Sequence, residues 1–157
     1  MNSASINEIR KALSSVEPKL IQALCLRLAR YKKENKELLN YLLFEAEDEP
    51  GYIQAVKSEM DELFKEVANK NLYLAKKVLR KILRYANRQI KYSGLPQTDL
   101  ELRIYFCEKM LAQKLPLTTG TVLYNLYQQQ LKKIDTVLAK LPEDEQGDYT
   151  RSIKKIS

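Results

Sequence analysis

The sequence contains no histidine, and this absence removes several kinds of chemistry. Histidine is the commonest general base near neutral pH, so a Ser-His-Asp triad, a Cys-His pair and a carboxylate-histidine di-iron site are all excluded. The only two cysteines, Cys25 and Cys107, are too few for a zinc site, and both fall on apolar stripes where a thiol packs as a small hydrophobe. We therefore expect two core cysteines, no metal, no cofactor and no catalytic residue, and hence no enzymatic activity.

Two patterns that could carry chemistry have simpler interpretations. The segment Thr118-Thr119-Gly120-Thr121 lacks the lysine of a phosphate-binding loop and predicts a helix cap. Glu59, Glu62 and Glu66 share one face of a predicted helix close to basic residues, which keep carboxylates ionised. This acidic triplet therefore indicates a polar helix flank and not an acid and base pair.

Long apolar runs are also missing. No stretch approaches the roughly 18 to 20 uninterrupted apolar residues of a membrane-spanning helix. Residues 1–8 are polar and include an acid, which differs from the basic start and apolar run of a secretory signal. Together with two cysteines that are far apart in the sequence, these features favour a cytoplasmic protein without a membrane span.

Glycine and proline are scarce, at four and five residues, and they mark breaks between helical segments. Between the breaks, apolar residues recur at helical spacing and do not alternate as in a strand. The length of 157 residues and the 45% hydrophobic content predict a single helical domain over 1–141 and a loosely held C-terminal tail over 142–157. The fold class is therefore all-α, with six to eight antiparallel helices.

Seven helices are expected individually. Their approximate ranges are 5–13, 18–31, 38–46, 50–67, 72–93, 98–111 and 119–141, with a charged turn over 32–36. Capping boxes open the first helix, at Ser5 and Glu8, and the sixth, at Thr98 and Glu101. The last six helices form three successive pairs with short connections. An irregular bundle and a stack of helical hairpins, HEAT-like or armadillo-like in architecture only, both fit this pattern.

Acidic residues are missing between Glu66 and Asp99, while eight lysines and arginines lie there. The other 19 basic and 20 acidic residues sum to -1, so this segment accounts for the whole net charge of +7. A rotation of about 100° per residue places six of the eight cations in one stripe, with an apolar arc on the opposite side. The predicted binding residues are these six cations and three tyrosines in or beside the stripe: Lys70, Lys77, Lys81, Arg84, Arg88, Lys91, Tyr73, Tyr85 and Tyr92.

Three interpretations of this stripe are open. Lysines and arginines often form an ordinary solvated helix face. The preceding acidic helix is a second possibility, but it is expected to reach only Lys76 and Arg80 and to leave the six cations of the stripe unpaired. The third is a partner, for which we predict an acidic protein surface or peptide, with weak, sequence-tolerant binding of RNA or DNA as the alternative. The sequence thus predicts a non-catalytic helical interaction or scaffold protein.

Overall fold

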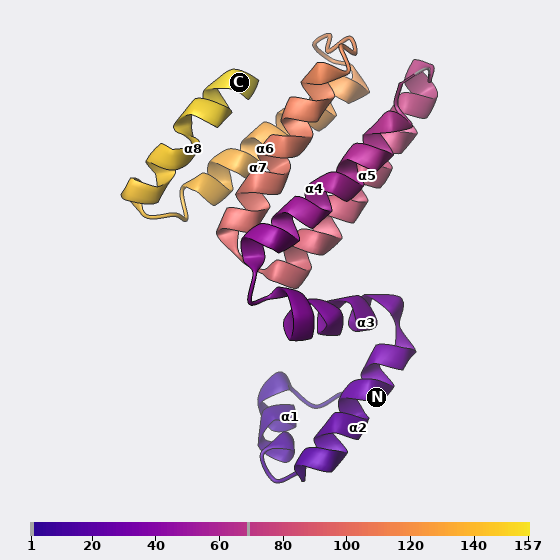
Figure 1. The fold of residues 1–157 in the computed structure, drawn as a ribbon, viewed down its shortest axis with the longest axis vertical. Coiled ribbons are helices and arrows are strands. Elements are labelled where there is room, and N and C mark those ends of the chain that lie inside the picture. Colours follow the sequence, from indigo (N-terminus) through magenta and orange to yellow (C-terminus); the bar gives the residue numbers. More distant parts are fainter. Residues whose placement is uncertain (1, 69) are drawn as a thin grey trace. The chain divides into compact units, whose positions relative to one another are not determined.

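The computed structural model of the chain describes residues 2–68 and 70–157. These residues form eight α-helices, one short π-helix and no strand, which confirms the predicted all-α fold class. Contacts divide the chain into two compact units (Figure 1). The N-terminal unit is Met1–Phe44 and the C-terminal unit is Glu45–Ser157.

The N-terminal unit contains three short helices. They are α1 (Ile6–Leu13), α2 (Pro18–Tyr31) and α3 (Lys33–Asn40). The predicted capping box opens α1, because the Glu8 amide donates to Ser5 Oγ at 3.2 Å and the Ser5 amide donates to the Glu8 carboxylate at 2.6 Å. The predicted charged turn over 32–36 is wrong, since only Lys32 is extended, with φ of -140°, and α3 begins at the next residue. The π-helix η1 (Tyr41–Glu45) follows α3 directly.

The described part of the C-terminal unit is a five-helix bundle (Figure 1). Its helices are α4 (Glu49–Lys65), α5 (Leu72–Ser93), α6 (Pro96–Ala112), α7 (Val122–Leu138) and α8 (Glu143–Ile156). Helix α6 contacts α4, α5, α7 and α8, so the other four helices of this unit surround it. These neighbours fit a helical bundle, and the successive pairs α4 with α5 and α6 with α7 also fit a row of stacked hairpins.

The composition of α6 explains its central position. Its side chains are buried around the whole helix and not along one stripe, as Leu100, Leu102, Ile104 and Phe106 are each at most 5% exposed. A helix with buried apolar side chains on several sides needs neighbours on several sides. Leu111, which the sequence places on a single apolar stripe, is 39% exposed instead.

One carboxylate connects the ends of three helices. Glu49, in the first turn of α4, accepts hydrogen bonds from Ser93 Oγ at the end of α5 and from Thr98 Oγ1 near the start of α6, both at 2.5 Å. The predicted capping box of Thr98 and Glu101 is therefore wrong. The Thr98 hydroxyl donates its hydrogen bond to Glu49, and α6 already begins at Pro96. A buried threonine is here used for a tertiary contact instead of a local cap.

Residues 142–157, which the sequence analysis treats as a loosely held tail, contain α8. Ile156 is only 2% exposed, and the Tyr127 hydroxyl of α7 donates a hydrogen bond to the Ile156 carbonyl oxygen. Gln146 Nε2 also donates to the Leu141 carbonyl at 2.8 Å. The hydrogen bond from Tyr127 to Ile156 connects the end of α8 to α7.

Candidate functional site

The ends of α5 are fixed by two local signals. At its start, the Asn71 side-chain oxygen accepts a hydrogen bond from the Leu74 amide at 2.9 Å. At its end, Gly94 has a left-handed φ of 69° and donates its amide to the Ile90 carbonyl at 2.8 Å. Glycine takes this conformation without a Cβ clash. The helix therefore has the predicted bounds, 72–93, and its 22 residues span about 33 Å.

One face of α5 is part of the bundle core. Five apolar side chains three or four residues apart are buried on this face: Ala75, Leu79, Ile82, Ala86 and Ile90. The Tyr52 hydroxyl of α4 donates to the backbone and side-chain oxygens of Gln89, at 3.1 and 2.7 Å. Packing and hydrogen bonds thus fix the rotation of α5 about its axis.

The opposite face of α5 displays the predicted cations, which we call the basic face. Its members are the exposed residues Lys77, Lys81, Arg84, Arg88 and Lys91. Lys70 is also exposed, but it lies in the connection before α5, because the helix begins only at Leu72. The structure therefore gathers five of the six predicted cations on one helix.

Lys81 has an intramolecular partner that the sequence analysis did not assign. Its Nζ lies 3.6 Å from Glu66 Oε2, at the C-terminal end of α4, and the two side chains are 54% and 47% exposed. An exposed pair of this kind contributes only about 0.2 to 1 kcal/mol. The prediction that all six stripe cations lack a partner is wrong for Lys81.

The acidic flank of α4 also pairs with a cation of its own helix. Glu62 Oε1 lies 2.7 Å from Lys65 Nζ, one helical turn away. The predicted partners of this flank were Lys76 and Arg80, and among the described residues neither forms an ion pair. That prediction is wrong because Glu62 pairs with its i, i+3 neighbour and Glu66 pairs with Lys81 instead.

The rest of the basic face is not neutralised within the described chain. Among residues 2–68 and 70–157, no carboxylate forms an ion pair with Lys77, Arg84, Arg88 or Lys91, and Lys70 has none either. Like charges on one rigid helix add their fields. This face therefore attracts anionic groups over much of the length of α5.

The three predicted tyrosines differ in exposure. Tyr73 is 65% exposed, and Lys77 Nζ lies 4.7 Å from its ring centre, within cation–π distance. Tyr85 and Tyr92 are half-buried. Tyr73 is thus the most accessible of the three rings.

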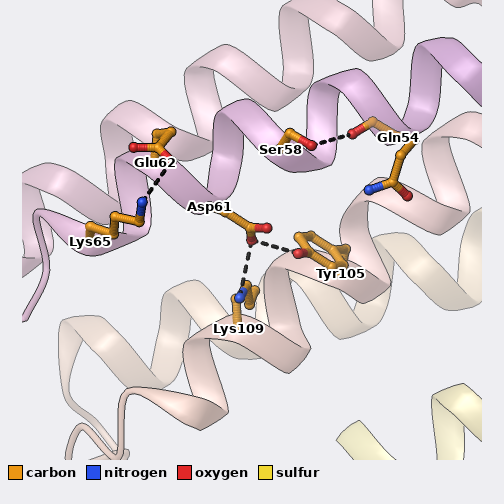
Figure 2. Close-up of polar contacts among 7 residues, drawn as sticks. All are labelled: Gln54, Ser58, Asp61, Glu62, Lys65, Tyr105 and Lys109. Atoms are coloured by element: carbon orange, nitrogen blue, oxygen red, sulfur yellow. Dashed lines mark hydrogen bonds and ion pairs between the residues drawn. The ribbon is translucent and has the colours of Figure 1, made fainter.

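A second polar cluster, between α4 and α6, has no counterpart in the sequence analysis. The Asp61 carboxylate accepts a hydrogen bond from the Tyr105 hydroxyl at 2.5 Å and lies 3.1 Å from Lys109 Nζ (Figure 2). Lys57 and Lys109 lie 5.2 and 5.7 Å from the Tyr105 ring centre. The i, i+4 spacing of Tyr105 and Lys109 is the one local pattern that indicates a contact between these two side chains. Their contact with Asp61 on α4 depends on how the two helices pack.

The protonation states in this cluster favour a structural role. Burial and the neighbouring Asp61 carboxylate both raise the pKa of Tyr105, so its hydroxyl keeps its proton near neutral pH. Burial alone would raise the pKa of Asp61, but the hydrogen bonds from Tyr105 and Lys109 outweigh it and the net shift is downward. A neutral phenol donating to an ionised carboxylate is a stable connection between two helices.

The two cysteines have different environments. Cys107 is fully buried, and burial raises the pKa of its thiol to about 12. Cys25 is exposed on α2. The expectation that both cysteines belong to the core is therefore wrong for Cys25, because the N-terminal unit leaves most of its apolar side chains uncovered.

The described part of the chain contains neither a candidate metal site nor a candidate membrane-spanning helix. Within residues 2–68 and 70–157, cysteine and carboxylate side chains form no group of three or more that could hold a metal ion. No helix of these residues is long and apolar enough to cross a membrane. Comparison of the chain with protein families, curated proteins and solved structures finds no match.

Proposed function

We propose that this protein is a non-catalytic helical interaction protein whose basic face binds an acidic protein surface or peptide. The observation that supports this most directly is the row Lys77, Arg84, Arg88 and Lys91, exposed on one helix face without a carboxylate partner in the described chain. From Lys77 to Lys91 this row spans about 21 Å at the rise of an α-helix. It is long enough for several carboxylates of one partner to bind together.

The rigidity of α5 favours binding. The Asn71 cap, the Gly94 terminus and the buried face hold the backbone in place before any partner arrives. Binding then costs the ordering of a few lysine and arginine side chains and no folding of the helix. Because the cations are exposed, association should be fast and should weaken as salt is added.

Nucleic-acid binding is the second candidate, and the Tyr73 ring beside Lys77 supports it. Single-stranded nucleic acids bind to cationic grooves with aromatic rings on which bases stack. Tyr85 and Tyr92 are half-buried, however, so they offer much less ring surface than a stacking platform needs. The acidic protein partner is therefore the preferred proposal.

Fluorescence anisotropy with defined probes tests both candidates. The probes are a labelled poly-glutamate peptide, a labelled oligo-uridine RNA and a labelled DNA duplex, each titrated at low salt. The binding variant carries Lys77→Glu, Arg84→Glu and Arg88→Glu on the basic face. A matched control makes the same change in net charge at exposed positions in and after α7: Lys132→Glu, Lys133→Glu and Lys140→Glu.

We expect the peptide to bind the wild type, to lose about tenfold in affinity with the basic-face variant and to keep its affinity with the α7 control. An equal loss with both variants would mean that the total charge matters and the basic face does not. Tighter binding of RNA or DNA than of the peptide, lost with the basic-face variant, would favour the nucleic-acid candidate instead.

A further inference from the structure

The N-terminal unit exposes most of its apolar side chains. Of its described residues, 2–44, only Tyr41 is buried. Thirteen large apolar side chains of this unit are at least 36% exposed, among them Leu43 at 63% and Phe44 at 75%. A unit of this length is close to the limit below which a chain cannot bury a core by itself. Apolar surface of this extent marks an interaction site.

Part of this surface is a groove between α2 and α3. The two helices are connected at the turn by a hydrogen bond from Asn35 Nδ2 to the Leu28 carbonyl at 2.8 Å. Beside this turn lies an open groove of about 600 Å³ whose apolar lining includes Leu26, Leu39 and Phe44. A groove between two helices, with an apolar floor, is the usual receptor for the apolar side of a third helix.

The rim of this groove is positively charged. Four cations line it, Arg30, Lys32, Lys33 and Lys36, and no acidic residue does. One of the four, Lys33, lies 3.7 Å from the Glu37 carboxylate in the next turn of α3. The unit as a whole has eight basic and four acidic residues, a net charge of +4. The groove thus combines an apolar floor with an unbalanced positive rim.

This charge distribution discriminates between possible occupants. A second copy that docks through the same groove would bring the same four cations against the rim, and like charges oppose that contact. A lipid bilayer presents anionic groups over a flat surface, which suits the convex side of an amphipathic helix better than a concave groove. An acidic amphipathic helix matches both the shape of the floor and the charge of the rim.

We propose that the groove between α2 and α3 binds an amphipathic helix of a partner protein, with the apolar side of that helix on the groove floor and its acidic flanks against the rim. The partner helix needs apolar residues spaced i, i+3, i+4 and i+7, with Asp or Glu on either side. The rim cations Lys32 and Lys36 are exposed and free to meet these carboxylates. This site lies on other helices than the basic face of α5 and does not depend on it.

The test uses the full chain and a labelled helical peptide made of repeats of Leu-Glu-Glu-Leu-Leu-Glu-Glu. Two control peptides replace every Glu by Lys or scramble the order so that no apolar side forms. The rim variant is Lys32→Glu with Lys36→Glu, and the floor variant is Leu43→Ser. The matched charge control is Lys132→Glu with Lys133→Glu at exposed positions of α7. Circular dichroism confirms that each variant keeps its helix content.

We expect the acidic peptide to bind, both groove variants to weaken it by about tenfold or more, and the α7 control to stay within about twofold of the wild type. Equal binding of the lysine or scrambled peptide would overturn the proposal, as would an equal loss with the α7 control. Sedimentation velocity tests for a second copy of the chain in the groove, and flotation with phosphatidylglycerol vesicles tests for lipid. Self-association or vesicle binding that Leu43→Ser abolishes, without binding of the acidic peptide, would assign the groove to a second copy or to lipid.

Discussion

The Lys81 ammonium group lies 3.6 Å from the Glu66 carboxylate, and this ion pair connects the basic face of α5 to the end of α4. It is the one ion pair that a cation of this face forms within the described residues. The neighbouring acidic helix therefore neutralises a small part of the face and leaves most of its charge for a partner.

We expect Thr98→Val to destabilise the bundle. The substitution keeps the shape of the side chain but removes the hydroxyl that donates to Glu49 at 2.5 Å. A hydrogen bond to a charged group contributes about 1.5 to 3 kcal/mol to the free energy of unfolding. Urea unfolding of the full chain measures this loss. The control Thr136→Val, at an exposed site on α7, should change the free energy by less than about 0.5 kcal/mol; equal effects would contradict the role of Thr98.

Two glycine substitutions should shift stability in opposite directions. Gly94→Ala at the end of α5 forces alanine into a left-handed φ of 69° and should cost about 1 kcal/mol, although the space around it is open. Gly147→Ala within α8 meets no neighbour and should stabilise by about 0.5 to 1 kcal/mol through helix propensity. Thermal unfolding of the two variants shows whether the signs differ, and shifts of the same sign would contradict the assigned backbone conformations.

Asp61→Asn should show a pH-dependent loss of stability. The pKa of Asp61 in the folded protein lies below its ordinary value, because the hydrogen bonds from Tyr105 and Lys109 exceed the opposing effect of burial. Such a carboxylate stabilises the fold above the unfolded pKa of about 3.9, and this contribution disappears as the pH falls through the lower folded pKa. The variant should therefore be less stable at pH 7 by about 0.5 to 1 kcal/mol, typical of an exposed interaction.

The measurement for Asp61 is the urea midpoint of wild type and variant from neutral pH down to the acid limit of folding. The difference between them should shrink as the pH falls below about 4. Tyr105→Phe, which removes one of the hydrogen bonds, should show the same trend with smaller amplitude. A difference that grows toward low pH would contradict the ionised state of Asp61.

The two thiols should react at very different rates. Cys25 is exposed, whereas Cys107 is fully buried with a pKa raised to about 12. Titration of the native protein with an aromatic disulfide reagent should give one fast thiol and a second that reacts only after unfolding in guanidinium. Cys25→Ser should remove the fast phase. Two fast thiols in the native wild type would contradict the burial of Cys107.

As for α2, sequence patterns predicted both bounds of α5. Its apolar spacing is long and regular, and the break at Gly94 marks its end, so both bounds match the structure. The centre of the bundle was harder to predict. Helix α6 is covered from several sides, and a helix whose buried residues lie on several sides has no single apolar stripe that predicts its contacts.

The side-chain pairings depend on packing that no local pattern contains. Helical projection gives directions and ignores the length of side chains, so it missed the reach of Lys81 to Glu66. Asp61 and Tyr105 are 44 residues apart and meet only because α4 packs against α6. The prediction of a charged turn before Leu38 is wrong because lysine and glutamate are good helix formers, and α3 begins there.

A quantitative pull-down from native lysate tests the central claim most directly. Wild type is compared with the variant Lys77→Glu, Arg84→Glu, Arg88→Glu and with the α7 control of equal net charge, with nuclease added to remove bound nucleic acid. The proposed function predicts acidic proteins that bind the wild type and the α7 control and are lost from the basic-face variant. The same bound proteins on all three chains would contradict a docking role for the basic face.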